Sequence, residues 1–110
     1  MMTDGVKHDF ERAVDLFSQG KKEEAAAALR ALIARRPDYA DAYETLGMVL
    51  YKLGRLDEAI EWTEKLAALE PEEPMAHVNL SVFYMKKGMK ERAEEEKAKA
   101  TVLQFSRGKK

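Results

Sequence analysis

The side chains that could do chemistry are few and scattered. The two histidines, His8 and His77, lie far apart, and neither belongs to a metal-binding pattern such as H-E-x-x-H. The chain contains no cysteine, which excludes thiol catalysis, disulfides and zinc-thiolate sites. It has no recognisable serine elbow and no glycine-rich phosphate loop. The sequence therefore predicts no catalytic residue, no metal and no cofactor, and a protein that is not an enzyme.

The densest group of titratable residues has an ordinary structural interpretation. Three consecutive acids, Glu94, Glu95 and Glu96, stand beside Lys97 and Lys99. Acids and bases three or four residues apart pair along the exposed side of a helix. This run therefore predicts a solvated helix face. His77 falls at the start of a predicted helix, at a position where bulky side chains pack, so we expect it to be partly buried.

Composition and charge narrow the class of protein further. A chain of 110 residues with 45% hydrophobic residues suits one domain with a continuous core. The net charge of -1 provides no field that attracts nucleic acid or an anionic membrane. The N-terminal stretch has no apolar core of signal-peptide length, and no run approaches 18 apolar residues. We expect a soluble, cytoplasmic protein whose partners include neither nucleic acid nor membrane.

Small residues recur in register along the chain every 34 residues. The recurring glycines are Gly20, Gly54 and Gly88, and an alanine follows each of them five residues later, at Ala25, Ala59 and Ala93. Pro37 and Pro71 keep the same interval. A fixed period of this length is typical of a helical repeat array, in which stacked helix pairs form a surface that holds a partner. The question therefore moves from what the chain catalyses to what it binds.

The apolar residues between these glycines follow a helical period. Tyr43, Leu46 and Leu50 fall at i, i+3 and i+7, which is the spacing of one helix face. Helix ends are also marked, since Lys86 and Lys87 precede Gly88 and favour the end of a helix. The predicted fold is all-α, with helices at 7–19, 22–35, 40–53, 56–69, 74–87 and 90–105.

These features resemble three tandem tetratricopeptide repeats over residues 6 to 105. The second repeat matches the pattern of that family at Tyr43, Leu46, Gly47, Leu50, Gly54, Ala59, Thr63, Leu66 and Pro71. The third matches it at His77, Leu80, Ser81, Tyr84, Gly88, Ala93, Lys97 and Ala100. The first repeat departs from it at Asp9 and Arg12, as expected of a terminal repeat that has no preceding neighbour.

The resemblance implies a definite architecture. It is a right-handed superhelical stack of three helix-turn-helix units within one domain, residues 1–110. The units cover about 6–39, 40–73 and 74–105, followed by a basic tail at 106–110 and without a separate C-terminal capping helix. In this register Ala13, Gly47 and Ser81 on the first helices would face the recurring alanines on the second helices, where small side chains permit close approach. Trp62, Ile33, Ile60 and Leu69 would belong to the core between helices.

The resemblance also implies a concave groove lined by the first helix of each repeat. Its predicted lining residues, called the predicted groove below, are Phe10, Val14, Phe17, Met48, Tyr51, Met75, Val78, Asn79, Val82 and Met85. A contiguous apolar band is commonly an interaction site, and methionine adapts such a surface to differing ligands. We expect a protein partner that presents an extended peptide or the apolar face of a helix. The alternative is that these side chains only pack against the adjacent repeat or onto one another across a shallow groove.

The C-terminal helix provides a second hypothesis. It is charged through most of its length but ends in Val102, Leu103 and Phe105. Either its charged residues make the helix self-capping, or these apolar residues pack onto another copy as a homodimer. The sequence thus favours a non-catalytic adaptor, with a self-associating scaffold as the alternative.

Overall fold

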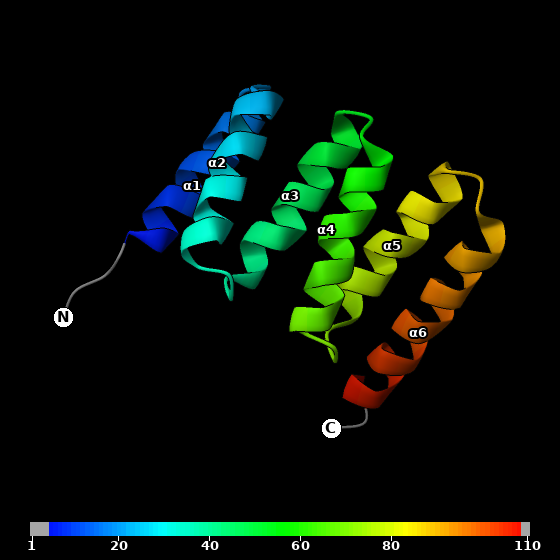
Figure 1. The fold of residues 1–110 in the computed structure, drawn as a ribbon. Coiled ribbons are helices and arrows are strands. Elements are labelled where there is room, and N and C mark those ends of the chain that lie inside the picture. Colours follow the sequence, from blue (N-terminus) through cyan, green and yellow to red (C-terminus); the bar gives the residue numbers. More distant parts are fainter. Residues whose placement is uncertain (1–4, 109–110) are drawn as a thin grey trace.

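The computed structural model describes residues 5–108, and over this range the chain is entirely helical apart from short turns (Figure 1). The helices are α1 Val6–Ser18, α2 Lys22–Arg35, α3 Ala40–Lys52, α4 Leu56–Leu69, α5 Pro74–Lys86 and α6 Lys90–Gly108. The predicted all-α class is confirmed, and most helix ends agree with the sequence to within one residue. The exception is α6, which runs past the predicted end at residue 105, so the start of the predicted basic tail is helical. Residues 109 and 110 of that tail lie outside the described residues.

The helices form antiparallel pairs that stack side by side. Figure 1 shows three hairpins in chain order, α1 with α2, α3 with α4, and α5 with α6. Between pairs, α2 packs on α3 and α4 packs on α5. Within residues 5–108 the repeats thus pack in chain order, which is the arrangement of a superhelical repeat protein.

Each pair is closed by the same glycine turn. At the end of α3, Gly54 has φ +79°, and the amide of Arg55 donates a hydrogen bond of 2.9 Å to the Leu50 carbonyl. A hydrogen bond that spans six residues in this way ends a helix. It requires one residue in the left-handed conformation, which glycine adopts at least cost. Gly20 and Gly88 have φ +82° and +81° and are followed by equivalent bonds. The repeating turn gives every pair the same connection.

The two helices of the second pair approach closely at Gly47. A Cβ atom added to Gly47 would lie 2.6 Å from the Thr63 hydroxyl, which itself donates a hydrogen bond of 2.7 Å to the Ala59 carbonyl. This distance is far shorter than a normal contact, so the predicted need for a small residue is confirmed here. The equivalent Ala13 is fully buried and Ser81 is half-buried.

The core between helices agrees with the sequence except at one residue. Ile33 and Ile60 are buried, and Trp62 is half-buried with its ring 5.9 Å from that of Tyr43. Leu69 was expected in this core but is 38% exposed. It is the last residue of α4, and the loop residues that follow it are exposed, so nothing encloses its side chain.

We predict that Gly47→Ala destabilises the protein. Overpacking against Thr63 costs about 1 to 3 kcal/mol, which outweighs the gain of about 1 kcal/mol from replacing a helical glycine. In a Thr63→Ala background the obstructing hydroxyl is gone, and the same substitution becomes neutral or stabilising. Urea unfolding of both single variants and the double variant measures the coupling.

Ser81→Ala, at the equivalent position of the third repeat, is the matched control and should change stability little. An increase in stability for Gly47→Ala alone would contradict the close approach.

Candidate functional site

In the first two repeats, the predicted groove residues are partly covered by neighbouring elements. Phe10 is half-buried and lies edge-on against Tyr39, with ring centres 5.5 Å apart. Tyr51 is half-buried and stacks on Phe83 of α5, with ring centres 5.0 Å apart. Val14, Phe17 and Met48 are also half-buried. These side chains contribute both to packing and to the surface.

The third repeat exposes its predicted groove residues more fully. Met75, Val82 and Met85 are 40%, 45% and 48% exposed, and Val78 is half-buried. These four positions follow the spacing of one helix face, so the exposed apolar surface of α5 is continuous. The apolar surface of the predicted groove is therefore concentrated at the C-terminal end of the stack.

Asn79 does not fit the predicted groove. It is only 8% exposed, whereas we expected it to line the surface. Asn79 shares a helix face with Ala76 and Phe83, and Phe83 contacts α3. The Asn79 side chain therefore lies mostly within the fold.

A hollow of 510 Å³ lies between α5 and α6. Its lining residues are Val78, Ser81, Val82, Met85, Glu94, Lys97, Ala100, Thr101 and Gln104. The α5 side of this α5–α6 hollow is mainly apolar, whereas the α6 side carries charged and polar groups. Sequence reasoning identified the α5 side and missed the α6 side. The repeat period carries a signal for the α6 side. Lys97 and Thr101 are in register with Leu29 and Ile33, which are buried in α2.

Polar contacts hold α6 in place beside this surface. The Nδ1 atom of His77 lies 2.7 Å from an oxygen of the buried Glu96, and Lys99 donates a hydrogen bond of 3.3 Å to the same carboxylate. These contacts confirm the expected partial burial of His77 and show that Glu96 of the predicted solvated run faces inward. Nearby, the Tyr84 hydroxyl donates to Glu64 at 2.8 Å. Burial, aided by this hydrogen bond, raises the pKa of Tyr84 to about 12.

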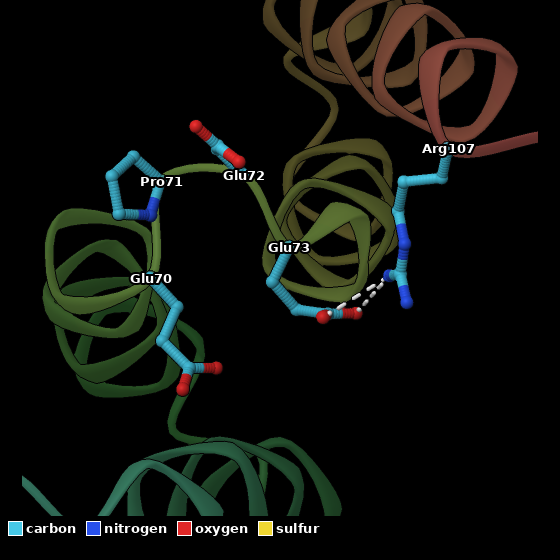
Figure 2. A pocket seen from close by; sticks show the side chains of 5 residues that line it. All are labelled: Glu70, Pro71, Glu72, Glu73 and Arg107. Atoms are coloured by element: carbon cyan, nitrogen blue, oxygen red, sulfur yellow. Dashed lines mark hydrogen bonds and ion pairs between the residues drawn. The ribbon is translucent and has the colours of Figure 1, made fainter. Parts of the chain in front are cut away.

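Glu70, Glu72 and Glu73 form an acidic edge in the turn between α4 and α5. Figure 2 shows Arg107 reaching from α6 to Glu73, to which it donates two hydrogen bonds of 3.1 Å, while Glu70 and Glu72 point elsewhere. These contacts also give a physical reason why α6 continues beyond its predicted end.

The acidic edge extends to α3 through Glu44. Burial raises the pKa of the Glu44 carboxyl, and neighbouring acids raise it further. Those acids are, in decreasing order of effect, Asp41, Glu73 and Glu70.

The predicted self-association residues lie on the last turns of α6. Val102 and Phe105 are 64% and 65% exposed, and Leu103 is half-buried. Val102 and Leu103 line a second hollow of 440 Å³ together with Pro71, His77, Ala98 and Lys99.

The described residues contain no group of three or more histidine, aspartate or glutamate side chains placed to hold a metal ion. Among the helices of residues 5–108, none has the length and apolar character needed to cross a membrane.

The stacked helix pairs define a helical-repeat protein. The chain belongs to the tetratricopeptide repeat family, whose model matches residues 10–74.

Similar proteins share the fold over most of this chain. The crystal structure of MamA is 30% identical with a TM-score of 0.92, and the match covers 96% of this chain and 61% of MamA. The Yersinia enterocolitica secretion chaperone SycD, in complex with a peptide of the translocator YopD, is 22% identical with a TM-score of 0.89. That match covers 93% of this chain and 78% of SycD.

A curated relative matches a shorter part. The rhomboid protease GluP of Bacillus subtilis (strain 168) is 29% identical over 77 residues, which are 70% of this chain. The match spans only 15% of GluP.

We predict that Glu44→Gln stabilises the fold at neutral pH and has no effect at about pH 4. Because the folded state raises the Glu44 pKa, charging this group lowers the free energy of unfolding as the pH rises above its ordinary value of 4.5. The gain should be about 0.5 kcal/mol, the usual range for a surface substitution. Urea unfolding at both pH values measures it.

Glu61→Gln, an exposed glutamate of α4, is the matched control. An equal gain for the two variants at neutral pH, or a Glu44→Gln gain that persists at about pH 4, would contradict the prediction.

Proposed function

We propose that the chain is a non-catalytic adaptor that holds an apolar segment of a partner protein against the first-helix surface of α1, α3 and α5. The observation that carries the proposal is the continuous apolar face of α5, where Met75, Val82 and Met85 are each at least 40% exposed. Exposed apolar patches of this kind mark interaction sites, and methionine side chains adapt to partners of different shape. The partner segment is a peptide or the apolar face of a helix.

Membership of the tetratricopeptide repeat family supports an interaction function. The complex of SycD with a YopD peptide shows that a protein of this fold holds a peptide, although its low identity to this chain transfers only the fold. The match to GluP covers too little of that protease to transfer its activity. The proposal includes no cofactor, nucleic acid or membrane, and it places the adaptor in the cytoplasm.

We predict that Met48→Glu with Met75→Glu abolishes capture of a partner from a lysate of the organism that encodes the chain. Two carboxylates on the first-helix surface would have to be desolvated without a partner charge, which opposes binding of an apolar segment. Affinity capture followed by mass spectrometry compares this variant with wild type. The single variant Met75→Glu tests the more exposed position by itself.

Met89→Glu makes the same chemical change in the exposed turn before α6, outside the predicted groove, and serves as the matched control. Circular dichroism and urea unfolding establish that each variant is folded. Identical captured proteins for wild type and the double variant would count against the groove, as would unfolding of the single variant, because its side chain would then be core.

Self-association is a second candidate function, favoured by the exposure of Val102 and Phe105 on α6. Both side chains are nearly two-thirds exposed, and together with Leu103 they offer an apolar end to an otherwise charged helix. A dimer that pairs two copies of this helix end would bury these residues.

For this candidate, we predict that Val102→Glu with Phe105→Glu lowers the molar mass measured by light scattering from dimer to monomer. Carboxylates placed opposite one another in a symmetric interface repel and lose their hydration. Thr101→Glu adds charge on the same helix, facing the α5–α6 hollow, and is the control. A wild-type chain that is monomeric at high concentration would exclude this function.

A further inference from the structure

The junctions between successive repeats, called the inner junctions below, show which kind of side chain the α5–α6 hollow can hold. At the junction between the second and third repeats, the ring of Phe83 packs 5.0 Å from that of Tyr51. Its Cε2 atom also lies 3.9 Å from the position that a Cβ of Gly47 would take. One repeat period further along the chain, Gly47 and Tyr51 correspond to Ser81 and Met85, and both line the hollow. The α5–α6 hollow is therefore the equivalent of the site that receives Phe83.

The second helices extend this correspondence. Thr63 and Leu66 of α4 are 1% and 2% exposed at the inner junction. Their equivalents in the hollow are Lys97 and Ala100 of α6, and Lys97 is exposed. The hollow thus combines an apolar wall on α5 with a polar wall on α6. An occupant of this hollow must therefore present apolar groups to α5 and polar groups to α6.

Ion pairs at the inner junctions indicate the charge of an occupant. Glu23, in the first turn of α2, accepts a hydrogen bond of 2.8 Å from Arg55, which follows α3. Asp57, in the first turn of α4, pairs with Lys87 directly after α5. In both cases an acid in the first turn of a second helix meets a cation of the turn that follows the next first helix. Glu91, in the first turn of α6, occupies the equivalent register position.

We propose that the α5–α6 hollow docks an amphipathic helix of a partner protein, placed against α5 and α6 as α5 is placed against α3 and α4. The helix inserts a bulky apolar residue between Ser81 and Met85, as Phe83 is inserted at the inner junction. It carries a small residue seven positions earlier, where α5 has the fully buried Ala76, and a lysine or arginine at its C-terminal end opposite Glu91.

The first helix of a second copy, stacked head to tail on this chain, does not meet these requirements. The α1 residues in register with Ala76 and Phe83 are His8 and Asp15, and both are exposed. Stacking α1 onto the hollow would place the Asp15 carboxylate in the site of the bulky apolar residue, which is unfavourable without a partner charge. A helix of a partner protein that carries the residues named above meets these requirements, whereas α1 of a second copy does not.

The test uses a helix whose docking geometry the fold already defines. The probe is a fluorescein-labelled peptide of residues 74–89, with a hydrocarbon staple joining positions 78 and 82 on the side that faces away from α3. The staple is needed because an isolated helix of this length is marginal in water. Fluorescence anisotropy measures its binding to the full chain.

We predict saturable binding to wild type, at least tenfold weaker binding to Thr101→Arg, and loss of binding when the peptide carries Phe83→Ser. Thr101 is exposed and lines the hollow, so a long side chain there obstructs an incoming helix without disturbing the core. Thr101→Ser is the conservative control and should bind as wild type does. Glu91→Lys should weaken binding about threefold, and a Lys87→Glu peptide should restore it.

The outcomes separate this site from the predicted groove. Met75→Glu, which alters the groove outside the hollow, should leave peptide binding unchanged even if it abolishes partner capture. Absence of binding to wild type would overturn the proposal, as would equal binding to wild type and to a folded Thr101→Arg variant. Equal binding of the two peptides with and without Phe83 would overturn it as well.

Discussion

The close approach of the two helices within each repeat is the constraint on which the rest of the structure depends. Gly47 leaves no room for a methyl group beside the Thr63 hydroxyl, and the equivalent Ala13 is completely buried. Because the helices lie this close, one glycine turn is enough to connect them, and the same turn recurs after α1, α3 and α5. The uniform hairpins then stack in a regular order, so that equivalent residues of successive repeats have equivalent surroundings.

Regular stacking also determines where the apolar surface is available. Each repeat covers part of the one before it, as Phe83 of the third repeat covers Tyr51 of the second. Within the described residues nothing packs in the same way on α5 and α6, so Val82 and Met85 are exposed. The repeat register places predicted groove residues in all three repeats, but their exposed apolar surface is therefore concentrated at the C-terminal end of the stack. Both proposed binding sites include this end, which explains why they share residues and require variants that separate them.

One register position shows how the repeats differ while the architecture stays the same. Asp9, Tyr43 and His77 are equivalent, yet they bind different partners. Asp9 pairs with Arg35 at 2.8 Å, Tyr43 packs on the Trp62 ring, and His77 contacts Glu96. An ion pair, an aromatic contact and a buried polar pair thus occupy the same place. The backbone tolerates each because the turn glycines and the alanines of the second helices are unchanged, and the residues at Ala13, Gly47 and Ser81 all stay small.

The sequence by itself determined the six helices of the described chain, their turns, their pairing and the repeat family. These features depend on local spacing, such as glycine after each first helix, and on a period that repeats it. Only the tertiary structure decided which of the predicted core and surface residues are buried. Asn79 is buried, Leu69 is exposed, and the α6 wall of Lys97 and Thr101 joins the apolar face of α5. The physical reason is that exposure depends on whether a neighbouring element covers a residue, and helical periodicity within one repeat contains no information about that neighbour.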